Sequence, residues 1–134
     1  MTGWFEQTGV ILFVEHYERC VAFYRDVLEL AVEEEKPALV RFDFGGAYLM
    51  VERGGVGRAE SKSRAENPTT LRFNVADIEE AVAWLRAKGV APEVHRWEWG
   101  ITANFLDPDG NRLELRDPFH AGGAVLRPAA KSPI

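Results

Sequence analysis

The chain has 134 residues, of which 46% are hydrophobic and 28% charged, and it carries a net charge of −5 with a pI near 5.2. These values predict one soluble globular domain with its own core, and they exclude an intrinsically disordered chain. The acidic balance argues against a nucleic-acid partner, because phosphate contacts need a basic surface.

The longest apolar run, residues 9–14, is far too short to cross a bilayer, and no basic segment leads into an apolar one at the N-terminus. The sequence therefore predicts a cytoplasmic protein with no membrane partner. The one cysteine, Cys20, rules out an intrachain disulfide. Its place on the apolar side of a predicted helix favours a packed core thiol over a nucleophile.

The first half of the chain begins with a predicted strand at residues 10–14, which has strand length and β-branched content. A helix is predicted over residues 17–28, because its apolar residues recur on one stripe: Val21, Tyr24, Val27 and Leu28. Three further strands are predicted at residues 31–34, 39–44 and 47–52.

Residues 54–68 are rich in Gly, Ser and charge and lack periodicity, which indicates a linker. The second half opens with a strand at residues 69–75, where polar and apolar residues alternate. A helix over residues 77–88 follows, begun by a capping-box pair of Asp77 and Glu80. Three more strands are predicted at residues 93–96, 102–106 and 112–117.

The last hairpin contains DPDGN at residues 107–111, a tight turn in which Pro fixes φ and Gly supplies a positive φ. We interpret Asp107 and Asp109 as turn residues and not as acids. No pattern remains in residues 118–134, which are interpreted as a loose tail.

The two halves repeat each other. The segment VEHYERCVAFYR at residues 14–25 aligns with VADIEEAVAWLR at residues 75–86, and a Gly-marked hairpin follows in each half. We therefore expect a single α+β domain of two paired βαβββ modules, over residues 9–53 and 69–117. A helix would cover one face of each sheet, and the opposite faces would form a curved trough.

Two motifs resemble a known family. FYRDVLEL at residues 23–30 resembles a helix end, and FLDPDGNRLEL at residues 105–115 resembles a closing hairpin, of the vicinal oxygen chelate superfamily. That superfamily holds glyoxalase I, extradiol dioxygenases, and fosfomycin and bleomycin resistance proteins. The resemblance spans residues 9–117 and implies the glyoxalase/bleomycin resistance/dioxygenase fold. One scaffold carries many activities, so it indicates fold more strongly than function.

By this resemblance, the four metal-ligand positions fall on Gly9, Met50, Thr70 and Glu114. Glycine has no side chain, a lone threonine hydroxyl is a poor ligand, and a thioether suits only soft metals. Glu114 alone does not hold a divalent ion. The resemblance therefore implies no metal site of the family type and no cofactor, which argues against glyoxalase, dioxygenase and metal-dependent transferase activities.

The chain is similar in pattern to the bleomycin-resistance branch, which sequesters its ligand without a metal. Trp99-Gly100 and the DPDGN turn reproduce the spacing of that branch, although Ile101 replaces the arginine that usually follows Trp-Gly. The resemblance also implies a homodimer, because this family commonly completes its trough with a partner chain.

Alternation places a mixture of apolar and polar side chains on the concave face, as in small-molecule sites. The candidate ligand-binding residues are Phe13, Tyr48, Met50, Thr70, Arg72, Asn74, Trp97, Trp99, Glu114 and Arg116. Arg72 and Glu114 form either a mutual ion pair or a ligand contact; if the pair is buried, Glu114→Ala should cost roughly 3–5 kcal/mol. Trp97 and Trp99 either stack on a flat or cationic ligand or pack at the rim or a dimer contact.

Two function classes remain open, besides a purely structural or regulatory module, which an empty, collapsed trough would indicate. The favoured one is a metal-free binder that sequesters a small organic ligand in a dimer trough. The alternative is an enzyme of the vicinal oxygen chelate type, a lyase, isomerase or dioxygenase, that uses Glu114 with or without an atypical metal site. Glu114 is then the one candidate catalytic residue.

Overall fold

The computed structural model describes residues 3–119, so most of the predicted tail lies outside the described residues. The first half contains β1 (Gly9–Val14), α1 (Tyr17–Ala22), η1 (Phe23–Val27), β2 (Val32–Lys36), β3 (Leu39–Phe44) and β4 (Ala47–Arg53). The second half contains β5 (Thr70–Asn74), α2 (Ile78–Ala87), β6 (Glu93–Trp97), β7 (Gly100–Leu106) and β8 (Arg112–Arg116).

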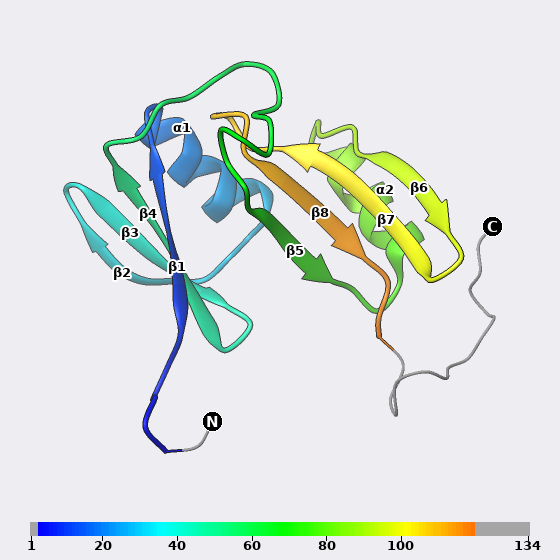
Figure 1. The fold of residues 1–134 in the computed structure, drawn as a ribbon, viewed down its shortest axis with the longest axis horizontal. Helices are drawn as coiled ribbons and strands as arrows, with labels where there is room; N and C mark the ends of the chain where they lie inside the picture. The colour runs from blue at the N-terminus through cyan, green and yellow to red at the C-terminus, as the bar shows by residue number, and fades with distance from the viewer. Residues whose placement is uncertain (1–2, 120–134) are drawn as a thin grey trace. The chain divides into compact units, whose positions relative to one another are not determined.

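The two halves share one sheet topology (Figure 1). The strand order is β1-β4-β3-β2 in the first sheet and β5-β8-β7-β6 in the second. The first strand of each half pairs in parallel with the last, and the other pairs are antiparallel. The predicted α+β fold of two repeated modules is confirmed.

In the first half, α1 packs on β4 and buries Tyr17, Cys20 and Val21. The predicted helix over residues 17–28 changes its winding, because residues 23–27 form a π-helical turn in which Leu28 N–H donates to Phe23 O at 3.0 Å. Tyr24 lies in that wider turn and is fully buried. Burial also raises the pKa of the Cys20 thiol, so the cysteine is a packed core residue, as predicted.

In the second half, α2 packs on β7 and β8 and covers one face of the sheet (Figure 1). Its buried residues Ile78, Val82 and Leu85 recur at helical spacing. The Asp77 carboxylate accepts a hydrogen bond from Glu80 N–H at 3.1 Å, so the predicted cap at the start of this helix is present. Among residues 3–119, no helix has the length and apolar character needed to span a bilayer.

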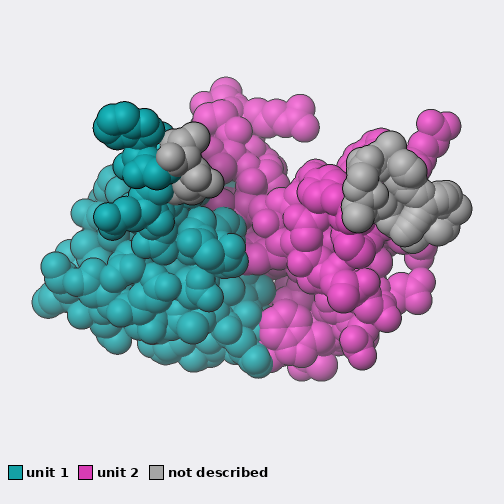
Figure 2. All heavy atoms as spheres, turned by 90° about the horizontal axis from the view of Figure 1, so that it is seen from below, with its two compact units in different colours: residues 1–60, 107–110 teal, residues 61–106, 111–134 magenta. Residues whose placement is uncertain are grey.

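The chain divides into two compact units (Figure 2). The first contains residues 1–60 and 107–110, and the second contains residues 61–106 and the chain from residue 111 onward. The boundary at residue 60 falls inside the segment interpreted as a linker. The β7–β8 turn therefore belongs to the first unit, although both of its strands belong to the second.

The two aspartates of this turn form it, as interpreted from sequence, and they also bind residues that are distant in sequence. Asp109 is fully buried and accepts hydrogen bonds from Glu15 N–H at 2.6 Å and His16 N–H at 3.1 Å, while His16 Nδ1 lies 2.8 Å from its Oδ1. The Tyr24 hydroxyl donates to Asp107 Oδ2 at 2.7 Å. Composition showed the turn but not these partners, which are distant in sequence.

Candidate functional site

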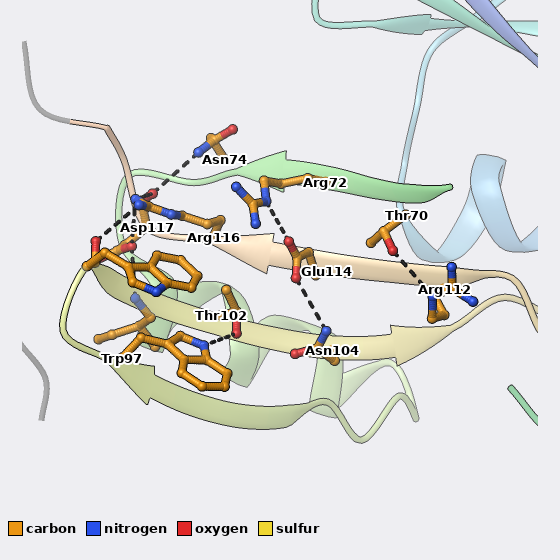
Figure 3. Close-up of polar contacts among 12 residues, drawn as sticks. Thr70, Arg72, Asn74, Trp97, Thr102, Asn104, Arg112, Glu114, Arg116 and Asp117 are labelled. Carbon is orange, nitrogen blue, oxygen red and sulfur yellow. Dashed lines mark hydrogen bonds and ion pairs between the residues drawn. The ribbon is translucent and has the colours of Figure 1, made fainter. Parts of the chain in front are cut away.

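The polar face of the second sheet lies opposite α2. The register pairs Arg72 of β5 with Glu114 of β8, and Glu114 in turn with Asn104 of β7. Directly opposed residues point to the same face of a sheet, so these three side chains stand in one row across three strands (Figure 3).

A hollow of about 650 Å³ lies over this face. Its lining comes from β5 to β8 and from the segment before β5: Lys62, Ser63, Arg64, Thr70, Arg72, Glu93, His95, Trp97, Trp99, Thr102, Asn104, Arg112 and Glu114. Five of the residues predicted to bind ligand are among them: Thr70, Arg72, Trp97, Trp99 and Glu114.

The floor of the hollow is a hydrogen-bonded row. Arg72 Nε donates to Glu114 Oε2 at 2.5 Å, and Asn104 Nδ2 donates to Glu114 Oε1 at 3.3 Å (Figure 3). An ionised carboxylate only accepts hydrogen bonds, so the amide nitrogen of Asn104 must face it. The ion pair that the sequence offered as one alternative is therefore present, and both oxygens of Glu114 are engaged.

Arg72 is held by one edge only. Its side chain is 38% exposed, and Glu114 contacts it through Nε. The terminal nitrogens Nη1 and Nη2 have no hydrogen-bond partner among residues 3–119. A guanidinium carries five N–H donors in a planar fork. Four of the five N–H groups of Arg72 thus remain free to bind something else.

Arg112 lines the hollow but has a structural task. Its guanidinium donates to the backbone oxygens of Lys62, Asn67 and Thr69 and to the Thr70 hydroxyl. These contacts hold the segment before β5 against the start of β8, together with a Lys62 Nζ bond to Asn111 Oδ1 at 3.0 Å. This part of the predicted linker is a fixed wall of the hollow.

Two tryptophans form the rim at the β6–β7 turn. The Trp97 and Trp99 rings are nearly parallel, with 3° between their planes and 5.8 Å between centroids. Trp97 Nε1 donates to Thr102 Oγ1 at 3.0 Å, which fixes that ring. The side chains remain accessible, with 44% of Trp97 and 55% of Trp99 exposed. His95 lies next along, with its ring centroid 5.6 Å from that of Trp97.

Arg116 supports the rim from behind. Its guanidinium carbon lies 5.1 Å from the Trp99 ring centroid and 4.4 Å from that of Phe119, and Nη2 donates to Trp99 O at 3.1 Å. Its Nε is buried without a hydrogen-bond partner among the described residues. Arg116 and Asn74 do not line the hollow, and Asn74 Nδ2 instead lies 3.4 Å from Asp117 O.

The remaining predicted residues, Phe13, Tyr48 and Met50, belong to the first sheet. They share the face opposite α1, because Met50 pairs with Ile11 and the other two lie two positions away on the same strands. A Cβ at Gly9 would lie 2.3 Å from the Tyr48 ring, so that ring fills the space of a side chain at position 9. As ligand contacts, these three residues stay predictions.

The residues at the family's metal positions do not fit a metal. Tyr48 covers Gly9, the Thr70 hydroxyl contacts Arg112 Nε at 3.3 Å, and both oxygens of Glu114 are engaged. Within the described part of the chain, no group of three or more His, Cys, Asp or Glu side chains could hold an ion. We therefore derive no chemistry through a bound metal.

The family model described as the glyoxalase/bleomycin resistance protein/dioxygenase superfamily matches residues 6–115. The chain belongs to this superfamily. No curated protein matches the sequence significantly.

Several solved structures share the fold of this chain. A lactoylglutathione lyase from Agrobacterium tumefaciens is 24% identical, with a TM-score of 0.66 over 82% of this chain and 91% of that one. A protein of unknown function from the same organism is 25% identical, with a TM-score of 0.65 over 89% and 97%. A glyoxalase/bleomycin resistance protein/dioxygenase from Nocardioides is 16% identical, with a TM-score of 0.68 over 95% and 92%.

Sequence reasoning missed part of the lining. Thr102 and Asn104 alternate with apolar residues on β7, and that alternation was a usable signal. His95 falls within the strand predicted at residues 93–96 but was not among the candidate ligand-binding residues; it stands in β6 and lines the hollow. Lys62, Ser63 and Arg64 come from an aperiodic segment, which offered no signal at all.

Proposed function

We propose that this superfamily member binds and sequesters a small organic ligand in the hollow of the second sheet, without a metal ion. The observation that carries the proposal is the hollow of about 650 Å³, which combines an accessible tryptophan pair with a fixed polar floor. Small-molecule sites are concave and combine apolar walls with a few well-placed polar groups. The Trp99-Gly100 spacing supports a place near the bleomycin-resistance branch.

Binding is favoured over catalysis by the state of Glu114. A general base needs a substrate proton within hydrogen-bond reach. Each oxygen of Glu114 already accepts one hydrogen bond, from Arg72 or from Asn104, so a substrate proton would share the carboxylate with both of these partners. Its contacts suit a positioning residue that orients Arg72.

The tryptophan rim gives the direct test. Trp99→Ala should weaken the binding of a planar aromatic ligand by roughly 1–3 kcal/mol, the scale of aromatic stacking, while changing stability little. Trp84→Ala is the matched control, because Trp84 lies on α2, away from the hollow, and is also partly exposed. Titration calorimetry with 2-naphthamide measures both. Equal affinities in the two variants would place the ligand elsewhere.

Metal content tests the other half of the proposal. Protein purified without chelator should carry Fe, Mn, Ni and Zn well below one ion per chain by elemental analysis. A stoichiometric ion would favour the enzyme alternative.

We also propose a homodimer, as is common in this family. Light scattering at micromolar concentration should then give about twice the 15.1 kDa of one chain. A strictly monomeric species would refute that part alone.

A further inference from the structure

The hollow differs in charge from the chain around it. Its lining carries four cationic side chains, Lys62, Arg64, Arg72 and Arg112, against two acidic ones, Glu93 and Glu114. The whole chain has a net charge of −5. An excess of positive charge gathered in one hollow of an acidic protein favours an anionic ligand there.

The cations of the lining are not equivalent. The Arg112 guanidinium donates hydrogen bonds to backbone oxygens of the protein itself, and Lys62 is buried, with its Nζ bonded to Asn111. Arg64 is exposed in the segment before β5. Arg72 differs from these three, because its Nε edge is fixed on Glu114 while Nη1 and Nη2 stay free. Glu114 is itself fixed by Asn104, so the free edge of Arg72 is held in one orientation.

We propose that the ligand of this hollow is an aromatic carboxylate, whose carboxyl group binds the free edge of Arg72 and whose ring packs near Trp97 and Trp99. This rests on the proposed function. The planar guanidinium matches a planar carboxylate, with two parallel N–H···O bonds.

The tryptophan rim by itself would also attract a cation. A cationic ligand would, however, place its charge in a hollow where positive side chains outnumber negative ones and where Glu114 is already paired. The floor therefore favours the anion, and the rim supplies the flat apolar surface that both kinds of ligand would use.

Three probes of one shape separate these cases: 2-naphthoate, neutral 2-naphthamide and cationic 2-naphthylmethylammonium, each titrated into the full chain by calorimetry. We expect naphthoate to bind about 10-fold to 100-fold more tightly than naphthamide, the range for hydrogen bonds to a charged group. The ammonium probe should bind most weakly. Naphthoate affinity should also fall with added salt.

Variants locate the contact. Arg72→Gln should remove the preference for naphthoate and leave naphthamide binding within about 3-fold, because only the charged contact is lost. Arg72→Lys should restore part of the preference, since it keeps the charge without the fork. Arg96→Gln is the matched control: Arg96 stands on β6 between His95 and Trp97, so it points to the opposite face.

The outcomes separate the two proposals. Equal affinity for naphthoate and naphthamide, or a preference that survives Arg72→Gln, would refute the carboxylate while leaving a small-molecule binder in place. Tightest binding of the ammonium probe would mean that the hollow binds a cationic ligand and not an anionic one. If none of the three probes binds, the proposed function fails together with this inference.

Discussion

At the scale of single residues, the Arg72–Glu114 pair is less buried than the sequence suggested. Glu114 is 11% exposed but Arg72 is 38% exposed, so an unpaired guanidinium could still reach water. Glu114→Ala should therefore cost about 1–2 kcal/mol of unfolding free energy, less than the roughly 3–5 kcal/mol expected for a buried pair. Urea denaturation measures it, with Arg72→Ala as the partner in a double-mutant cycle. A loss above about 3 kcal/mol would mean that the pair behaves as buried.

The same pair shows what sequence can reach at this scale. Arg72 and Glu114 each stand at a polar position of a strand with alternating pattern, and the paired modules predict that their strands are neighbours. Their contact follows from the two-residue alternation of each strand and from the register of β5 against β8. The partners of Asp107 and Asp109 do not follow, because a turn motif specifies its own backbone and not the distant residue that its side chain meets.

At the scale of elements, the β7–β8 turn fastens the start of α1. Burial by itself would raise the pKa of Asp109, but hydrogen bonds from Glu15 N–H and from His16 outweigh burial and hold that pKa below the ordinary 3.8. A carboxyl whose pKa is lowered in the folded state stabilises the fold above its ordinary pKa. That stability is lost as the pH falls through the lowered value.

We therefore expect the unfolding free energy to fall as the pH drops below about 4, and Asp109→Asn to flatten that dependence. Urea titrations at pH 6, 4 and 3 compare the two proteins. Asp26→Asn is the control, since Asp26 is exposed and pairs with its neighbour Arg25. An unchanged slope in Asp109→Asn would mean that other carboxyls dominate acid unfolding.

Elements were predicted well where a period was sustained, as in β3 and α2, and less well where the backbone departs from one. The segment after Ala22 keeps its apolar stripe but winds as a π turn, which a stripe of four residues cannot distinguish from an α-helix. The segment before β5 has no period, and its order comes from contacts with Arg112 of β8 and with Asn111, the residue just before that strand. The conformation of such stretches is determined by contacts between segments that are distant in sequence.

At the scale of the whole molecule, the first unit is not continuous in sequence. Residues 107–110 belong to it, and they supply the Asp107 contact to Tyr24 and the Asp109 contacts at the start of α1. Gly110 fits there because a Cβ would lie 2.3 Å from Glu60 O. Since the turn forms only between β7 and β8, the first unit depends on a hairpin whose strands belong to the second.

This dependence predicts an asymmetry between two fragments. A fragment of residues 1–60 lacks the turn, and Tyr24 and the backbone N–H groups of Glu15 and His16 then lose their partners. Each buried group without its partner costs about 1–3 kcal/mol, a large share of the stability of a small domain.

A fragment of residues 61–119 keeps both strands and the turn in one piece. We expect circular dichroism to show cooperative thermal unfolding for the second fragment and not for the first, and mixing the two should restore structure in the first. If residues 1–60 alone unfold cooperatively, the turn is dispensable, and the two modules fold as independent halves.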